Sequence, residues 1–162
     1  MNQIRSTGSA LLFAALMLTL LPGCGQPTAP PYDALVSTRQ PIFGIPTGSD
    51  SFTLQASVTN TLDETITLDL AGRDLRSLEK WVSGSWRLAY SPAYTDQGRV
   101  PVPVEPGETR QLQTWLNLVK APNTYPRFKY DIPGTYRGVY RFERGGSFIE
   151  AYSNPFELRW AK

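Results

Sequence analysis

Apolar and polar residues alternate along two neighbouring segments of the chain, 52–58 and 65–70, which a polar turn at 60–64 separates. Successive side chains of a β-strand point to opposite faces, so a period of two gathers the apolar residues on one face. These residues are Phe52, Leu54, Ala56 and Val58, followed by Ile66, Leu68 and Leu70. The pattern predicts two antiparallel strands that are each buried on one side, with Asp69 on the solvated side of the second.

Turns that contain glycine predict further strands downstream. The tripeptide Ser83-Gly84-Ser85 separates the apolar segments 78–82 and 86–90 and is typical of a hairpin. Pro-Gly pairs at 106–107 and 133–134 suit the central positions of a type II turn, because proline presets the first and glycine permits positive φ at the second. We expect strands after both pairs.

The last third of the chain carries the longest strand signals. Tyr136, Tyr140 and Phe142 share one face of the segment 135–143, with Gly138 between them, and Gly145-Gly146 then closes a hairpin. In the following segment, 148–160, Pro155 interrupts the ladder, which predicts a bulge or a strand that changes sheets. Alternation places Trp86 and Trp160 with other apolar residues, so both are predicted to lie in the core.

The strand pattern predicts an all-β fold, an antiparallel β-sandwich of about seven to eight strands. Convincing helical periodicity is absent from the sequence after residue 24, although 70–80 could hold one turn of helix. The proline-rich segment 24–48 favours extended backbone and is expected to act as a tether. Its later part, with Ile42, Phe43 and Ile45, could dock as a first edge strand.

The domain predicted over 49–162 resembles the bacterial immunoglobulin-like domains of lipoproteins and surface proteins. The residues that carry the resemblance lie at turns and strand ends: Val58-Thr59-Asn60, Gly84-Ser85-Trp86, Pro106-Gly107-Glu108-Thr109, Pro133-Gly134-Thr135-Tyr136-Arg137 and Ser153-Asn154-Pro155-Phe156-Glu157-Leu158. The Pro-Gly-Glu-Thr turn, followed by Trp115 and then Pro-Gly-Thr-Tyr, is also similar to a small β-sandwich family of bacterial protease inhibitors. The resemblance implies an immunoglobulin-like fold and transfers no catalytic residue.

The N-terminus resembles that of bacterial lipoproteins. Leu21-Pro22-Gly23-Cys24 follows Arg5 and a short apolar stretch, 10–21, as in a signal peptide that ends at a lipidated cysteine. This implies a signal peptide over 1–23, acylation (palmitate included) of Cys24, and a membrane-anchored protein of the cell envelope. Gly25 is compatible with sorting to the outer membrane, on the periplasmic or the surface side. An ordinary secretory signal with an incidental cysteine is the alternative.

Composition argues against several function classes. The chain has a net charge of +2, which is far from the strongly basic balance expected of a nucleic-acid-binding domain. It has no histidine, and its one cysteine is the predicted acylation site, so the commonest general base and metal ligands are missing. Asp69 and Asp74 could bind calcium in principle, but they lack the spacing of a calcium loop. We therefore expect no enzymatic activity, no cofactor and no metal.

The long segment 117–133 is the first candidate binding site. Its aromatic and basic residues suit stacking and cation–π contacts with a peptide or a sugar. They are Lys120, Tyr125, Arg127, Phe128, Lys129 and Tyr130. The alternative is that the aromatic rings fold back and cap the open end of the sandwich.

The second candidate site is a set of arginines on the outward faces of the last strands, Arg137, Arg141 and Arg159, with Arg144 at the hairpin. Their guanidinium groups could bind an anionic polymer or an envelope protein. The alternative is cross-strand pairing with glutamates of the same strands, Glu143, Glu150 and Glu157.

Two functions remain open from the sequence. The first is a lipid-anchored binding or structural module that acts through protein or polymer contacts. The second is a tethered protease inhibitor that presents the segment 117–133.

Overall fold

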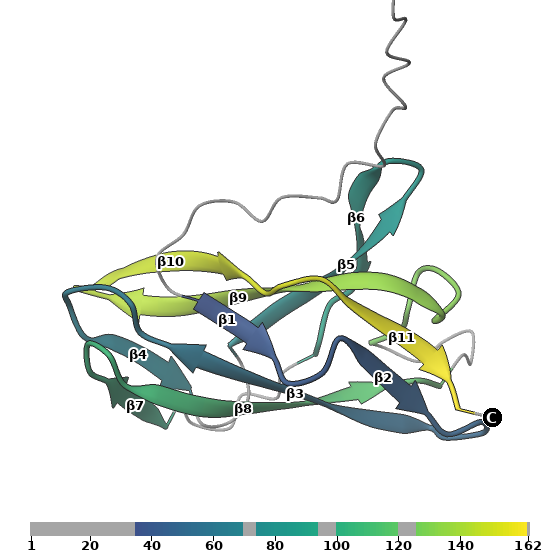
Figure 1. The fold of residues 1–162 in the computed structure, drawn as a ribbon, viewed down its shortest axis with the longest axis horizontal. Helices are drawn as coiled ribbons and strands as arrows, with labels where there is room; N and C mark the ends of the chain where they lie inside the picture. The colour runs from purple at the N-terminus through teal and green to yellow at the C-terminus, as the bar shows by residue number, and fades with distance from the viewer. Residues whose placement is uncertain (1–34, 70–73, 94–99, 120–125, 162) are drawn as a thin grey trace, which may run out of the picture.

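The computed structural model describes residues 35–69, 74–93, 100–119 and 126–161, and these form an all-β protein of two packed sheets (Figure 1). Eleven strands are present in the described ranges, and no helix occurs there. The first six strands are β1 (Leu35–Thr38), β2 (Ile42–Ile45), β3 (Ser51–Thr59), β4 (Ile66–Asp69), β5 (Leu75–Val82) and β6 (Ser85–Tyr90). The others are β7 (Pro101–Val104), β8 (Thr109–Asn117), β9 (Gly134–Arg144), β10 (Ser147–Tyr152) and β11 (Phe156–Trp160). The predicted β-sandwich is therefore confirmed.

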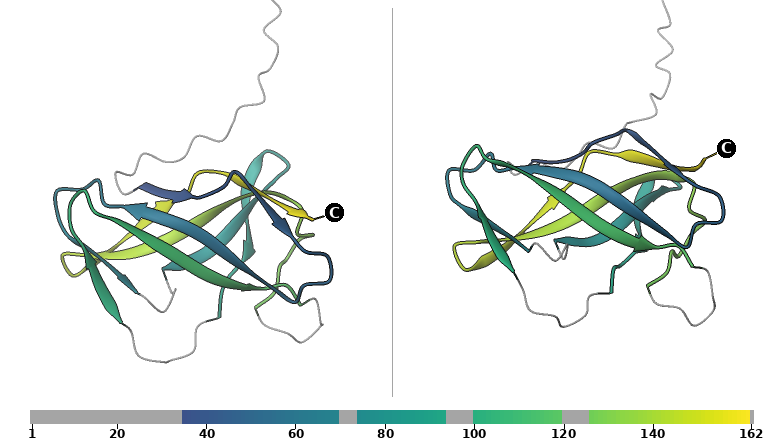
Figure 2. Two further views of the ribbon diagram at one scale, coloured as in Figure 1. Left: turned by 60° about the horizontal axis from the view of Figure 1, so that its bottom comes forward. Right: turned by 90° about the horizontal axis from the view of Figure 1, so that it is seen from below.

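The small sheet has the order β1-β3-β8, and the large sheet is built around β9. Strands β10 and β11 pair with β9, and so do β4 and β5. Beyond these neighbours, β6 pairs with β5, β7 pairs with β4, and β2 runs parallel to β11. Figure 2 shows β3 and β8 crossing in front of β9, with the core between the sheets.

The core is formed by the residues that the alternation selected. Leu54, Ala56 and Val58 of β3 are buried, and so are Tyr136, Tyr140 and Phe142 of β9. Gly138 lies between the tyrosines of β9 and leaves room for the Tyr140 ring, which would lie 2.4 Å from a Cβ atom at that position. The predicted inward faces of both strands are confirmed.

Strands β1 and β2 fall inside the segment 24–48, which was expected to be a tether. They are part of the reason why the structure has more strands than the seven to eight that were predicted. Phe43 and Ile45 are buried, and β2 is an edge strand, as predicted for this part of the chain. The sandwich thus includes residues 35–48 as well as the predicted domain. The prediction of a possible helical turn at 70–80 was wrong from Leu75 onward, because that part forms strand β5. Residues 70–73 lie outside the described ranges.

The two Pro-Gly pairs behave differently. Gly107 has a φ of 79°, and Glu108 N–H donates to Glu105 C=O over 2.9 Å, as a type II turn requires. Gly134 instead begins β9 with a φ of 145°, so the second predicted type II turn was wrong. Its positive φ explains this glycine, because L side chains rarely adopt that backbone conformation.

Pro155 marks a bulge, as the sequence indicated. Ser153 is hydrogen-bonded to Gly138, whereas Phe156 pairs with Tyr136, so Asn154 and Pro155 together face one residue of β9. Strands β10 and β11 both stay in the large sheet, which excludes a change of sheet. The bulge also contacts β1 of the other sheet. Val36 and Ser153 form an isolated β-bridge, and Thr38 N–H donates a 2.8 Å hydrogen bond to Asn154 Oδ1.

The predicted core positions of Trp86 and Trp160 were wrong. The pairing of β5 with β6 shifts between Leu78 and Glu79, so Tyr90 enters the core while Leu88 and Trp86 lie on the outer face. Trp160 is 38% exposed, because it lies at the end of β11 beyond the last residue that pairs with β9. The alternation of apolar and polar residues in a sequence does not show where a register shift occurs or where a strand ends.

We predict that Gly138→Ala destabilises the fold. The new methyl group would force the Tyr140 ring from its place, which should lower the free energy of unfolding by about 1–3 kcal/mol. Urea denaturation measures this change. Gly44→Ala is the matched control within a strand, because its Cβ would meet only Ala161 Cβ at 3.7 Å. Equal effects of the two substitutions would contradict the prediction.

Candidate functional site

Arg137 of β9 lies between two aromatic rings on the outer face of the large sheet. Its guanidinium carbon is 4.7 Å from the ring centroid of Trp86, on β6, and 4.3 Å from that of Tyr152, on β10. These strands lie on opposite sides of β9, so the cation is held from both sides. Planar guanidinium groups favour such stacking on aromatic faces.

A carboxylate neutralises the same guanidinium group. Glu79 stands directly opposite Arg137 in the β5–β9 pairing, and Arg137 Nε donates to Glu79 Oε2 over 2.7 Å. The side chains are only 13% and 23% exposed, so water screens this ion pair weakly. Arg137 is therefore fixed in position and its charge is compensated.

Further aromatic side chains and a second arginine lie on the two sides of Arg137. The Trp81 ring meets the Trp86 ring edge-on at 5.2 Å, and the guanidinium carbon of Arg141 lies 3.8 Å from the centroid of Phe148. Leu88 and Phe148 are 41% and 49% exposed. We call this surface the aromatic–arginine face; it comprises Trp81, Trp86, Leu88, Arg137, Arg141, Phe148 and Tyr152.

The structure brings only two of the sequence-selected arginines, Arg137 and Arg141, onto this face. Arg159 makes two 2.6 Å hydrogen bonds to Glu157 of its own strand. Arg144 makes bonds of 3.0 and 3.1 Å to Glu64, which lies in the turn after β3. These arginines hold the pKa values of Glu64 and Glu157 below the ordinary range, through hydrogen bonding and charge.

Sequence reasoning missed most of the partners of these arginines. Glu157 pairs with Arg159 along the same strand, whereas the alternative interpretation expected pairing across strands, and Glu150 lies 3.8 Å from Arg76. Glu79 and Glu64 come from segments far away in sequence. Their roles depend on strand pairing, and a single sequence contains no signal for it.

The described part of the 117–133 segment closes one end of the core. The Phe128 ring packs on Tyr90, with centroids 4.6 Å apart, and on Tyr136 at 6.1 Å. Arg127, Lys129 and Tyr130 are exposed, whereas Lys120 and Tyr125 lie outside the described residues. The capping alternative thus describes Phe128, and Arg127 and Lys129 remain on the surface.

Hydrogen bonds hold the base of this segment. Tyr136 Oη donates to Ile132 C=O over 2.7 Å, and Lys80 Nζ donates to Pro133 C=O over 2.8 Å. At the other end, Asn117 N–H donates to Tyr90 Oη over 2.9 Å. Burial raises the pKa of both tyrosines and lowers that of Lys80. The tyrosines therefore stay neutral near pH 7.

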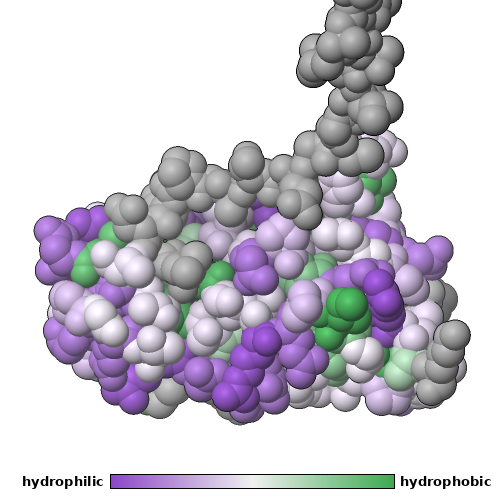
Figure 3. All heavy atoms as spheres, viewed as in Figure 1, coloured by the Kyte–Doolittle hydropathy of each residue, from purple (hydrophilic) through white to green (hydrophobic). Residues whose placement is uncertain are grey.

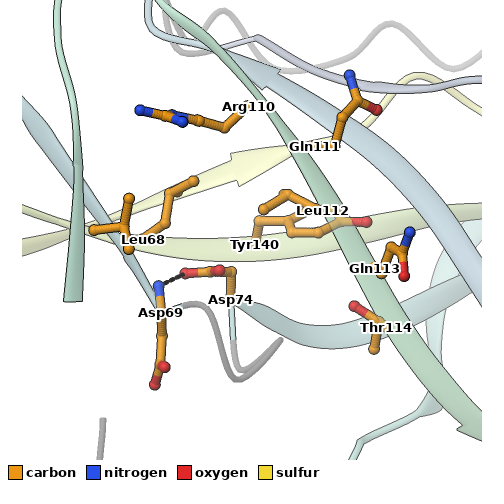
Figure 4. A pocket seen from close by; sticks show the side chains of 10 residues that line it. Leu68, Asp69, Asp74, Arg110, Gln111, Leu112, Gln113, Thr114 and Tyr140 are labelled. Carbon is orange, nitrogen blue, oxygen red and sulfur yellow. Dashed lines mark hydrogen bonds between the residues drawn. The ribbon is translucent and has the colours of Figure 1, made fainter. Parts of the chain in front are cut away.

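A cavity of about 340 Å³ opens between β8 and the strands β4 and β7 (Figure 4). Tyr140 forms its floor, with Leu112 of β8 in front of it. Asp69 and Asp74 also line this cavity, and each is 4% exposed. Asp69 N–H donates to Asp74 Oδ1 over 2.9 Å. The predicted solvated position of Asp69 was wrong, since its carboxylate sits at the end of β4 and accepts a 3.4 Å bond from Val100 N–H.

The described residues contain neither a cluster of potential metal ligands nor a membrane-spanning helix. No group of three or more histidine, cysteine, aspartate or glutamate residues is placed there to hold a metal ion. In that part of the chain, no helix is long and apolar enough to cross a membrane. Cys24 and the predicted signal peptide lie outside the described ranges.

No protein-family model matches the chain, and no curated protein matches it.

We predict that Arg137→Lys lowers the free energy of unfolding by about 1–2 kcal/mol, because an ammonium group cannot stack between two rings and also make the same bond to Glu79. Urea denaturation gives the stability, and tryptophan emission reports the change around Trp86. Arg159→Lys is the control: it alters an exposed pair and should leave both readouts unchanged. Equal losses of stability in the two variants would contradict the prediction, because the stacking of Arg137 would then add no more stability than an exposed ion pair.

Proposed function

We propose that the chain is a lipid-anchored, non-enzymatic module of the bacterial cell envelope, and that its sandwich binds another envelope protein through the aromatic–arginine face. The observation that carries this proposal is the arrangement of Arg137 between Trp86 and Tyr152, with Phe148 and Leu88 exposed nearby. Tryptophan, tyrosine and arginine are the residues that dominate the energetics of protein interfaces.

The geometry of this face favours a protein partner over an anionic polymer. Binding to a polyanion depends on guanidinium groups whose charge is available, and Glu79 already compensates Arg137. The rings and the guanidinium group are held in place by their mutual contacts before any partner arrives. Less conformational entropy is then lost on binding, which suits a specific interface.

The resemblance of the N-terminus to lipoproteins supports the anchor on Cys24. Ten residues separate Cys24 from Leu35, where the described part of the sandwich begins. Even a fully extended segment of this length spans no more than about 36 Å. An anchored sandwich would therefore work close to the membrane surface, within reach of other anchored proteins. The immunoglobulin-like resemblance is consistent with such a contact role.

The tethered-inhibitor alternative has less support. It needs the 117–133 segment to present its side chains to a protease, and Phe128 instead packs on the core residues Tyr90 and Tyr136. In the described part of the segment, the exposed residues are Arg127, Lys129, Tyr130, Asp131 and Pro133. The aromatic–arginine face instead exposes Leu88 of β6 and Phe148 of β10, which are 41% and 49% exposed.

Photocrosslinking in intact cells tests the interface. We expect a photoreactive amino acid at Leu88 or at Phe148 to capture the same envelope protein, because both side chains are exposed on the proposed face. Asp63 is the control position, since its side chain is 92% exposed and lies in the turn between β3 and β4, outside the strands that form the proposed face. The proposal fails if neither position gives an adduct, or if all three positions give the same one.

Cys24→Ser tests the anchor. The variant lacks the thiol that would carry the lipid, so we expect the protein to leave the membrane fraction and the Leu88 adduct to decrease. Fractionation by ultracentrifugation measures the distribution. Met17→Leu, a conservative change within the predicted signal peptide, should leave the protein with the membranes. Retention of the serine variant in the membrane fraction would rule out anchoring through Cys24.

A further inference from the structure

Among the strands that the structure describes, β8 is an edge strand, and a long stretch of it lacks the usual features that prevent further pairing. It contains nine residues, pairs with β3 alone, and keeps a one-to-one register from Thr109 to Asn117 without a bulge. Edge strands are usually protected by lysine, proline, bulges or a short length. Residues 111–117 contain no ionisable side chain and no proline. Figure 2 shows β8 as the outer strand of the small sheet.

The hydrogen bonds at the two ends of β8 determine which main-chain groups face the open edge. Leu118 N–H donates to Asp50 C=O, and Asn60 N–H donates to Glu108 C=O, so the even-numbered residues bond with β3 and its ends. Main-chain groups alternate along a strand, so those of residues 111, 113 and 115 point away from β3. Asn117, the next odd-numbered residue, donates to Tyr90 Oη, which agrees with this direction.

The open edge also borders the cavity of about 340 Å³ described above. Leu112 and Thr114, the inward side chains of β8, line it from the small sheet. Leu68, Val102 and Tyr140 form the apolar lining on the side of the large sheet, and Asp69, at the end of β4, and Asp74 lie next to them (Figure 4). A strand added beside β8 would direct every second side chain toward this cavity.

We propose that β8 is a peptide-binding edge, and that an uncharged, extended segment of a partner protein adds to it as a fourth strand of the small sheet. Main-chain bonds to residues 111, 113 and 115 supply the affinity, and an apolar side chain in the cavity supplies the selectivity. This surface belongs to the small sheet, so the inference stands independently of the aromatic–arginine face.

Charge determines which occupant fits this edge. The outward positions Gln111, Gln113 and Trp115 are exposed and neutral, so charged side chains on the outward face of an incoming strand would gain no ion pair from them. The opposite edge of β8 already accepts such a neutral strand. There β3, with the sequence SFTLQASVT, pairs along all nine residues and turns Leu54 and Ala56 inward. On the face drawn in Figure 3, hydrophobic residues occur as separate patches among hydrophilic ones.

A fluorescein-labelled nonapeptide with the β3 sequence, SFTLQASVT, is the probe. Its anisotropy is measured against the full chain in detergent, and we expect saturable binding. Two further peptides carry N-methyl groups on alternate residues, in the two possible phases. One phase should lose affinity about tenfold or more and the other should bind like the parent, since only one edge of an added strand bonds to β8.

Substitutions at Gln113 test the site on the protein. Gln113→Pro removes a main-chain donor that faces the open edge, a position where a strand tolerates proline, so the fold should persist and binding should fall about tenfold or more. Gln113→Ala keeps the donor and should bind like the unaltered chain. Thermal unfolding checks that both variants are folded.

Three results would overturn the proposal. The first is the absence of binding by the parent peptide, and the second is equal loss of affinity in both methylation phases. The third comes from light scattering: if the unaltered chain is a dimer that Gln113→Pro dissociates, the edge is occupied by a second copy of the chain and not by a partner peptide.

Discussion

Strand β9 holds the large sheet together, because it pairs with four other strands at once. Its inward residues Tyr136, Tyr140 and Phe142 fill the core, and its outward residues Arg137 and Arg141 lie on the aromatic–arginine face. Gly138 allows both roles by leaving space for the Tyr140 ring. The stability of the core and the geometry of the candidate site therefore depend on the same eleven-residue strand.

The two sheets have outer surfaces of different chemistry. The large sheet displays rings and guanidinium groups that are neutralised by nearby carboxylates, as for Arg137 with Glu79. The small sheet displays amides and hydroxyls, with Trp115 as its one large exposed apolar side chain among the described residues. A module with two such surfaces can make two separate contacts without interference between them. This suits a role in assembly better than a role in which one ligand is held in a deep pocket.

The parts of the fold that depend on local pattern could be predicted from the sequence. Alternation gave the inward faces of β3 and β9, and glycine marked the turns at Gly84 and Gly107. Features that depend on pairing between distant segments could not be predicted. The register shift at Leu78 moved Trp86 to the surface, and Glu79 became the partner of Arg137 only through the β5–β9 pairing. The edge position of β8 is likewise a property of the sheet order, which no residue of β8 encodes alone.

The parallel pairing of β2 with β11 has a consequence for how the protein is made. Residues 42–45 pair with residues 157–160, Ile45 C=O accepts from Ala161 N–H, and Thr38 N–H donates to Asn154, which lies 116 positions later. Contacts of such long range slow the folding of β-proteins. A chain that is synthesised from its N-terminus therefore cannot complete the large sheet until residues 154–161 have been made. During that interval β2 lacks its partner strand, and we expect the growing chain to need protection from aggregation.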